Sequence, residues 1–399
     1  MDIAKELSTS STAIQCVDMH TTGEPTRIVY QGYPELQGTL LEQRAQAKRS
    51  YDHIRRRLIL EPRGHRDMYG AILRPETEHT KSGQAHMGVI FLTNEGYSTM
   101  CGHATIALAR FLIDTHDKNI FPKRDDITFN KKKNEAELVL HAPCGLVKVT
   151  VPTIGEDGNR SHPSHSSYHL SVPSFATGID VRVEIPEEYR WPELGADRNH
   201  VIADFSYGGA FYCLVSTKEL GFPGRLERGK VDLSAMDLAT KNLKAAINRD
   251  ERLRYLFTHP DHEDLGFLYS VIVVDQEFDV AMRIDETTRA ETGICFFADQ
   301  QIDRSPTGSG VAARVALAYA KDHESKDESV AHHSMVSRSL GGKGGFVGSF
   351  WEEVGKTEHG YPIVRVQVEG RASYIGTSTF IVEESDPLGD DGFLFEKLC

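Results

Sequence analysis

The sequence predicts an α+β fold of two similar domains, each with a β-sheet curled around one buried helix. Residues 100–112 begin with Met100 and Cys101, a glycine and a polar residue, and continue with the small and apolar residues typical of a buried helix. Residues 303–316 repeat this order of residue types in the second half, with Thr307 in the place of the cysteine. Short apolar segments surround each helix. Two copies of one pattern indicate two related domains that face a common cleft.

In the first half of the chain, several short segments alternate apolar and polar residues, which is the pattern of half-buried strands. The predicted strands cover residues 13–18, 27–30, 69–73, 86–92, 137–140, 145–151 and 181–186. Residues 39–59 carry apolar side chains among many Arg and Lys residues, which predicts an exposed amphipathic helix.

The strand pattern starts again near residue 196, and this restart is the predicted domain boundary. Further strands are predicted over residues 200–204, 210–215, 269–274, 345–350 and 363–368, with a helix over residues 233–246. We therefore expect a first domain over residues 1–195, a second over residues 196–369, and a C-terminal tail over residues 386–399.

Cys101 is placed where a helix activates a thiol. The free amides and the dipole at a helix N-terminus stabilise a thiolate, so the pKa of Cys101 is expected to fall from its usual value near 8.5 towards neutrality. The same amides, with Gly102 permitting close approach, are suited to a substrate carboxylate. The alternative is an inert buried cysteine, which is the commoner role of this residue type.

The acidic composition limits the partners of the protein. The 399 residues carry a formal net charge of −13 with no basic block to offset it, which argues against nucleic acid or an anionic membrane surface as partner. No apolar run approaches the roughly 20 residues that span a bilayer, and the first twelve residues lack the apolar core of a signal peptide. We expect a cytoplasmic protein that acts on a small molecule.

The cysteines and histidines do not form recognisable metal-binding patterns. The six cysteines are scattered without a CxxC pair, which indicates a reduced protein rather than a disulfide scaffold or a zinc module. They are Cys16, Cys101, Cys144, Cys213, Cys295 and Cys399. A polar loop contains His162, His165 and His169, but no carboxylate or cysteine completes a ligand set there, so no metal site is predicted.

Several motifs resemble those of a known family. The segments at residues 100–103 (MCGH) and 303–310 (DRSPTGSG) are similar to the two active-site signatures of the proline racemase family. Segments at residues 18–28, 61–70 and 207–212 agree with the same family. The resemblance implies a diaminopimelate epimerase-like fold with mainly antiparallel sheets. It also implies a strand from about 370–385 that joins the first domain, a homodimer, and no cofactor.

The chain departs from the family pattern at Thr307. Racemases and 2-epimerases of the family carry a second cysteine there, and threonine marks the branch that dehydrates trans-3-hydroxy-L-proline. The resemblance implies that Cys101 removes the α-proton and assists loss of the 3-hydroxyl, while Thr307 faces the other side of the substrate ring. It further implies substrate contacts from Gly102, His103, Asp303, Gly308, Ser309, Tyr69 and Phe297.

The chemistry of one thiol is consistent with elimination of water. Inverting an α-carbon without a cofactor needs a proton acceptor on one face and a donor on the other, and a threonine alkoxide is too basic to form at neutral pH. Elimination to Δ1-pyrroline-2-carboxylate needs only one active face. Two alternatives stay open: a proline racemase or hydroxyproline 2-epimerase, which Thr307 disfavours, and a non-catalytic imino-acid binder, which Cys101, His103 and Asp303 disfavour.

Overall fold

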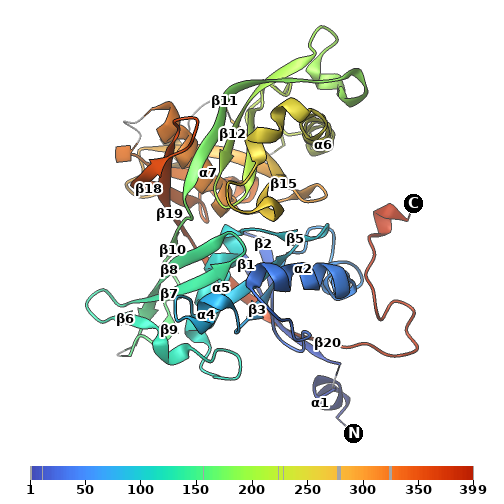
Figure 1. Ribbon diagram of the computed structural model, residues 1–399, viewed down its shortest axis with the longest axis vertical. Coiled ribbons are helices and arrows are strands. Elements are labelled where there is room, and N and C mark those ends of the chain that lie inside the picture. The colour runs from blue at the N-terminus through green and yellow to red at the C-terminus, as the bar shows by residue number, and fades with distance from the viewer. Residues whose placement is uncertain are drawn as a thin grey trace. The chain divides into compact units, whose positions relative to one another are not determined.

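The computed structural model describes residues 2–10, 12–155, 157–222, 224–227, 229–275, 280–322 and 326–398 (Figure 1). The contacts divide the chain into two units. Unit 1 comprises residues 1–169 and 371–399, and unit 2 comprises residues 170–370. The boundary lies before strand β11 (Ser174–Glu184), whereas the sequence analysis placed it at residue 195. The difference arises because β11 pairs along its length with β12 (His200–Tyr207) of unit 2.

Unit 1 is built on one series of paired strands. They are β1 (Ile14–Thr21), β2 (Glu24–Gln31), β3 (Gly70–Arg74), β4 (Met87–Leu92), β5 (Tyr97–Ser98), β6 (Thr128–Asn130), β7 (Glu135–Ala142), β8 (Gly145–Ile154), β9 (Arg160–Ser161), β10 (Ser167–Leu170) and β20 (Ala372–Phe380). In the order β20, β1, β2, β3, β4, β7, β8, β10, neighbours pair antiparallel, except that β2 with β3 and β4 with β7 are parallel. The strand expected from about 370–385 is β20, and it pairs with β1.

The strands of unit 2 close on themselves. Besides β11 and β12 they are β13 (Phe211–Ser216), β14 (Leu268–Val274), β15 (Arg289–Phe297), β16 (Gln301–Ile302), β17 (Ser329–His333), β18 (Phe346–Lys356) and β19 (Pro362–Gly370). The order β11, β12, β13, β14, β15, β17, β18, β19 is antiparallel throughout, except that β13 with β14 and β15 with β17 are parallel. Because β19 also pairs with β11, the series forms a ring.

The two units therefore repeat one topology. Read from β20 in unit 1 and from β11 in unit 2, the sequence of parallel and antiparallel neighbours is the same. A short hairpin precedes the central helix in each case, β4 with β5 in unit 1 and β15 with β16 in unit 2. This repeat confirms the predicted α+β class, with a mainly antiparallel sheet curled around one helix in each half.

The central helices are α5 (Gly102–Asp114) in unit 1 and α7 (Gly308–Lys321) in unit 2. Helix α5 packs against strands β1, β2, β7, β8, β9 and β20, and α7 contacts β11, β12, β13, β18 and β19. Nearly every residue of either helix is buried, as expected of a helix that is apolar on all sides. Arg314 is a buried charged residue of α7, and it forms an ion pair with Glu291 at 2.6 Å.

Other helices cover the outside of each sheet. In unit 1, α2 (Leu40–Ser50) and α3 (Asp52–Ile59) replace the single exposed helix predicted over residues 39–59. That prediction was wrong because the chain breaks at Tyr51 and because residues such as Leu40 and Leu58 join a buried cluster on the outer face of the sheet. Unit 2 has α6 (Leu233–Arg249) on the outside and the short α8 (Met335–Ser339). Unit 1 also contains α1 (Ile3–Ser8) and α4 (Glu78–Lys81).

A buried ion pair joins three strands of unit 1. Arg27 of β2 lies opposite Asp18 of β1, and its Nε and Nη2 atoms donate to the two carboxylate oxygens at 3.0 Å. Its Nη1 donates to the carbonyls of Leu58 and Arg63 at 2.6 and 2.7 Å, and its guanidinium stacks on Phe380 of β20 at 4.3 Å. These hydrogen bonds offset the cost of burying the charge of Arg27. The motif at residues 18–28 therefore holds β1, β2 and β20 together next to α5.

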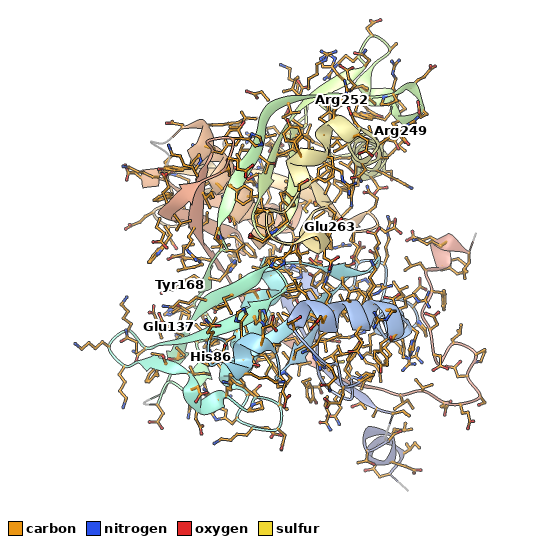
Figure 2. The ribbon with its side chains drawn as sticks, in the orientation of Figure 1. His86, Glu137, Tyr168, Arg249, Arg252 and Glu263 are labelled. Atoms are coloured by element: carbon orange, nitrogen blue, oxygen red, sulfur yellow. The ribbon has the colours of Figure 1, made fainter. Side chains whose placement is uncertain are left out.

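The exposed faces of the strands carry the polar residues. Along β7, Ala136, Leu138 and Leu140 are buried, while Glu137 faces outward (Figure 2) and pairs with Lys148 of β8 at 3.0 Å. None of the helices in the described ranges combines the length and the apolar character that crossing a bilayer requires.

Candidate functional site

Cys101 is the N-cap residue of α5. Its backbone is extended (φ −149°, ψ 112°), and its Sγ accepts a hydrogen bond from the amide of Ala104 at 3.3 Å. The side chain is 5% exposed. A sulfur that accepts from the third amide of a helix takes the place of the usual Ser or Asp cap. A negative charge on this sulfur is stabilised by the amide and by the helix dipole.

His103 lies beside the same sulfur. Its Nδ1 is 3.1 Å and its Nε2 3.4 Å from Sγ of Cys101, and the ring is buried. Burial lowers the pKa of His103 to about 3, against a smaller opposing effect of a hydrogen bond to the backbone of Pro25. The imidazole is therefore neutral at neutral pH. It can form a hydrogen bond with the sulfur or with a substrate. It carries no positive charge that would stabilise a thiolate.

The remaining residues predicted for unit 1 meet at the same helix start. Gly102 is the first residue of α5 and is buried. The ring of Tyr69, just before β3, packs edge to face on His103 at 4.7 Å. Thr21, which sequence reasoning did not single out, donates from Oγ1 to the carbonyl of His103 at 3.0 Å. Residues from β1, from the position before β3 and from α5 thus meet near the sulfur.

Thr307 precedes α7 in a strained conformation. Its φ of +63° and ψ of 85° lie in the left-handed region, which is unfavourable for a β-branched residue. Two contacts hold it there: Oγ1 donates to Oδ2 of Asp303 at 2.8 Å, and the amide donates to Oγ of Ser305 at 3.1 Å. Strain of this kind is typical of functional sites.

Asp303 orders the chain before α7. Its Oδ1 accepts the amide of Ser305 at 2.7 Å, while Oδ2 accepts from Thr307. Burial raises the pKa of Asp303 to about 6, although the hydrogen bonds from Ser305 and Thr307 act to lower it. At neutral pH the carboxyl is mostly ionised, and it accepts the hydrogen bond of the Thr307 hydroxyl.

The first turn of α7 is supported from β12 and β13. Gly308 and Ser309 are its buried first residues, and Ser309 Oγ is 2.6 Å from the hydroxyl of Tyr212 on β13. A Cβ at Gly208, in the turn between these strands, would be 2.2 Å from the carbonyl oxygen of Ser309. Sequence reasoning gave Gly208 and Tyr212 no role, and the signal was the YGGAFY segment at residues 207–212.

Phe297, the predicted aromatic wall of unit 2, ends β15 and is buried. Its ring lies 5.8 Å from that of Tyr269 on β14. In unit 2 the structure thus brings Asp303, Thr307, Gly308 and Ser309 together at the start of α7, with Phe297 at the end of the strand that leads into the preceding hairpin.

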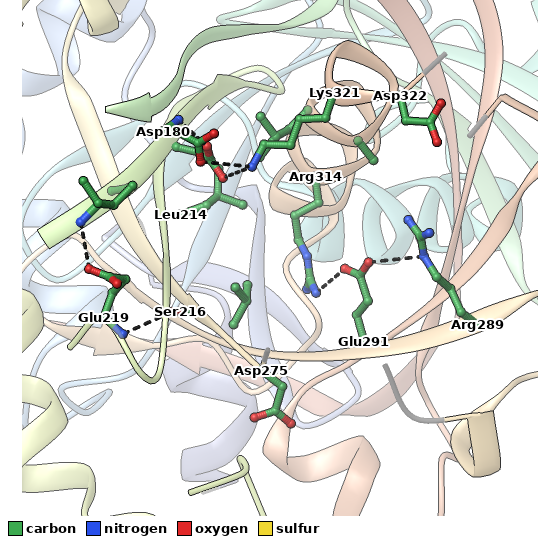
Figure 3. Close-up of a pocket in the computed structure, with 16 residues that line it drawn as sticks. Asp180, Leu214, Ser216, Glu219, Asp275, Arg289, Glu291, Arg314, Lys321 and Asp322 are labelled. Atoms are coloured by element: carbon green, nitrogen blue, oxygen red, sulfur yellow. Dashed lines mark hydrogen bonds and ion pairs between the residues drawn. The ribbon is translucent and has the colours of Figure 1, made fainter. Parts of the chain in front are cut away.

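A separate cavity of about 510 Å³ lies at the other end of α7 (Figure 3). Leu317, Ala318 and Lys321 from the last turns of the helix line it. Ion pairs fill its polar wall, among them Lys321 with Asp204 at 2.7 Å. A helix of this length separates its ends by about 20 Å, so the cavity contains none of the predicted site residues.

A set of side chains spaced for a metal ion occurs in unit 1. Glu78, His79 and His141 form it, and none of them contributes to the start of α5. At both helix starts the groups are those of proton transfer and anion binding: a thiol, a neutral imidazole, a carboxylate, and the amides of a helix terminus.

Comparison with known proteins gives a consistent result. The family described as proline racemase matches residues 16–394. A trans-L-3-hydroxyproline dehydratase of Pongo abelii is 41% identical over 384 residues, which cover 96% of this chain and 95% of the relative. A trans-3-hydroxy-L-proline dehydratase of Homo sapiens is 40% identical over 384 residues, with the same coverage of 96% and 95%.

A solved structure shares the fold. The hydroxyproline epimerase of Agrobacterium vitis, crystallised with trans-4-hydroxy-L-proline, has a TM-score of 0.75 over 96% of this chain and 95% of its own. Its sequence identity of 22% shows a common fold and nothing about the reaction.

Proposed function

The chain belongs to the proline racemase family, and from this we propose that it is a hydro-lyase that converts trans-3-hydroxy-L-proline to Δ1-pyrroline-2-carboxylate and water. The observation that carries the proposal is the hydrogen bond from Thr307 to Asp303 (2.8 Å) at the helix start that repeats the Cys101 position. A hydroxyl that donates its proton to Asp303 does not replace a second thiol as the acid or base on the other face of the substrate. The names of the relatives at 40% and 41% identity support the same reaction.

On the grounds of the family resemblance, residues at both helix starts are proposed to act on the substrate. The amides of Gly102 and His103 on α5, and of Gly308 and Ser309 on α7, would bind the substrate carboxylate. Amides at a helix start are suited to an anion, and a helix dipole directed at the carboxylate stabilises the negative charge that develops when the α-proton leaves. Tyr69 and Phe297 would form the aromatic walls around the ring.

In the proposed reaction, the thiolate of Cys101 takes the Cα proton. The Cα–H electrons form the double bond to C3 while the C3–O bond breaks, and the proton on sulfur passes to the departing hydroxyl, which leaves as water. The hydroxyl of the substrate is trans to its carboxylate, so the Cα hydrogen and the hydroxyl lie on the same face. One thiol can therefore serve both, in a syn elimination, and the enamine tautomerises to the imine.

Substitutions of Thr307 test the division of roles. Thr307→Ala is expected to lower kcat/KM by about tenfold, the loss of one hydrogen bond, because the hydroxyl orients the site but transfers no proton. Thr307→Cys supplies a thiol at the second helix start and is expected to add slow racemisation of proline. The measurements are pyrroline formation, α-proton exchange in deuterated solvent, and the chirality of recovered substrate.

The unsubstituted protein provides the control for these measurements. Incubation with trans-3-hydroxy-L-proline, trans-4-hydroxy-L-proline and L-proline is expected to yield a pyrroline from the first only. Efficient epimerisation or racemisation by the unsubstituted protein would overturn the lyase proposal in favour of an isomerase. Binding without turnover of all three compounds would favour the imino-acid binder.

The pH dependence should report Asp303. Because burial raises its pKa to about 6, the carboxyl is protonated below that pH and its charge no longer holds the Thr307 hydroxyl. Activity is expected to fall as the pH drops through about 6, and Asp303→Asn should remove this limb from the kcat/KM profile. Persistence of the same limb in the variant would assign it to another group.

The oligomeric state and the cellular location are also part of the proposal. We propose a cytoplasmic homodimer that uses no cofactor, on the grounds of the family resemblance and of the scattered cysteines. Light scattering of the purified chain and cell fractionation test the two statements.

A further inference from the structure

Two histidines and a carboxylate converge where the short helix α4 packs near β7. The residues are Glu78, His79 and His141, and one ligand atom from each lies within 4.8 Å of the other two. The Nε2 of His141 is 3.8 Å from Oε1 of Glu78. The rings of His79 and His141 meet edge to face, with 4.4 Å between their centroids. We refer to these three residues as the His–Glu cluster.

One nitrogen of His79 and one oxygen of Glu78 form hydrogen bonds with neighbouring residues. Nδ1 of His79 is 2.7 Å from Oε1 of Gln84. That oxygen also accepts from Ser82 Oγ at 3.1 Å, so the His79 nitrogen is the donor of the pair. Oε2 of Glu78 accepts the amide of Leu40, the first residue of α2, at 2.8 Å. These bonds leave Nε2 of His79 and Oε1 of Glu78 for the cluster.

Thr77 orients His141 in the same way. Its Oγ1 is 2.9 Å from Nδ1 of His141. The hydroxyl donates to Oγ1 of Thr80 at 3.4 Å and accepts the amide of Thr80 at 3.2 Å, so its remaining capacity is to accept the Nδ1–H of His141. Nε2 of His141 then carries the lone pair. Metal-binding histidines are oriented by such hydrogen bonds on the nitrogen that faces away from the ion.

The backbone makes room for this arrangement. Gly88 of β4 lies opposite His141 in the parallel pairing with β7. A Cβ at Gly88 would be 2.5 Å from Cγ2 of Thr77 and 2.8 Å from the carbonyl oxygen of Arg74. Glycine therefore allows Thr77 to lie over the strand and to reach His141. The cluster is closed on the side of the buried His141 and open to solvent at Glu78, which is exposed.

Two nitrogen lone pairs and a carboxylate within 4.8 Å of one another repel unless a positive charge lies between them. A divalent cation supplies such a charge, and the cluster offers it three ligand atoms. Histidine binds a metal ion as the neutral imidazole.

We propose that Glu78, His79 and His141 form a binding site for a divalent transition-metal cation of the Zn²⁺ type. Two imidazole nitrogens and one carboxylate oxygen suit this class of ion, and water from the open side completes the shell. Metal–ligand distances of about 2.0–2.1 Å place tetrahedral ligands roughly 3.3 Å apart. The separation of 3.8 Å between Glu78 and His141 then closes on binding. The ion ties α4, and through Leu40 the start of α2, to β7.

The test is a titration of the full chain, stripped with a chelator, with ZnCl₂ in a calorimeter. We expect a site whose affinity falls at least about tenfold in His79→Ala and in Glu78→Gln, with a rise in melting temperature on Zn²⁺ addition that both variants lose. Co²⁺ in place of Zn²⁺ is expected to give the visible absorption of a four-coordinate site. His141→Ala should weaken Zn²⁺ binding in the same way. Because His141 is buried, the test rests on the variants of Glu78 and His79, which are more accessible.

The control variant is His86→Ala. His86 (Figure 2) precedes β4 and bonds the amide of Val139 through Nδ1 at 2.9 Å, outside the cluster. Its removal is expected to leave Zn²⁺ affinity unchanged. The proposal is overturned if no Zn²⁺ binds, if His79→Ala and Glu78→Gln bind as the parent chain does, or if His162→Ala, in the stacked pair with His165, removes the binding instead. The readouts do not use turnover and stand apart from the proposed reaction.

Discussion

Cys101→Ser is expected to lower the dehydration of trans-3-hydroxy-L-proline by about a thousandfold, within the range of a lost general base. A serine hydroxyl is far less acidic than a thiol and cannot take the α-proton at neutral pH. The helix should survive the change, because serine is a preferred N-cap and can accept the Ala104 amide that now donates to Sγ. Steady-state kinetics and circular dichroism of the variant separate lost chemistry from lost structure.

The matched control for Cys101 is Cys144→Ser. Cys144 lies between β7 and β8, and burial raises its pKa to about 12, so its removal should not affect turnover. Iodoacetamide should likewise modify Cys101 first and be blocked by pyrrole-2-carboxylate, since burial also raises the pKa of Cys16 to about 12. Cys399 lies outside the described residues and is left out of this comparison. Near-normal activity of Cys101→Ser would refute the assigned role.

The second large effect is expected from Gly208→Ala, far along the chain from either active-site motif. The added methyl would meet the carbonyl oxygen of Ser309 at 2.2 Å and the amide nitrogen of Ala313 at 2.7 Å. These two atoms belong to the backbone in the first turns of α7, which can move only at a large cost in free energy. We expect a loss of stability of about 3 kcal/mol, at the upper end for overpacking.

The same change should also impair activity, because a shift of α7 moves Ser309 and Thr307 together. A misplacement of about 1 Å can cost roughly a hundredfold in rate. Thermal melting and kcat/KM of the purified variant measure both effects. Gly355→Ala in β18, whose nearest neighbour would be 4.0 Å from the new Cβ, is the control, and equal behaviour of the two variants would contradict the packing argument.

The sequence predicted those parts of the fold that depend on local pattern. The apolar runs after Cys101 and Thr307 identify α5 and α7, because few other structures tolerate a helix that is apolar on every side. The break at Tyr51 was missed, since residues 39–59 keep helical composition across it. The parallel pairs, β2 with β3 and β4 with β7, carry no local signal, because the partners of a strand are decided by the whole sheet.

The candidate site divides in the same way. Residue type and spacing pointed to Cys101 and Thr307, and the family resemblance pointed to His103 and Asp303. The structure finds all four at the starts of α5 and α7. The positive φ of Thr307 and its bond to Asp303 depend on a chain path that no pattern encodes. Tyr212 contacts Ser309 across 97 residues of sequence. The His–Glu cluster was missed for this reason too, since His141 is on a strand well separated in sequence from Glu78 and His79.

The place of β20 has a consequence for synthesis on the ribosome. Unit 2 is one continuous stretch, residues 170–370, while the sheet of unit 1 includes β20 at residues 372–380. A nascent chain therefore contains every strand of unit 2 before β20, the last strand of unit 1, has been synthesised. Until then β1 has an open edge, which is the kind of exposed strand that invites wrong pairing. Domains usually fold in N-to-C order, but here the half that carries Cys101 is the last to receive all of its strands.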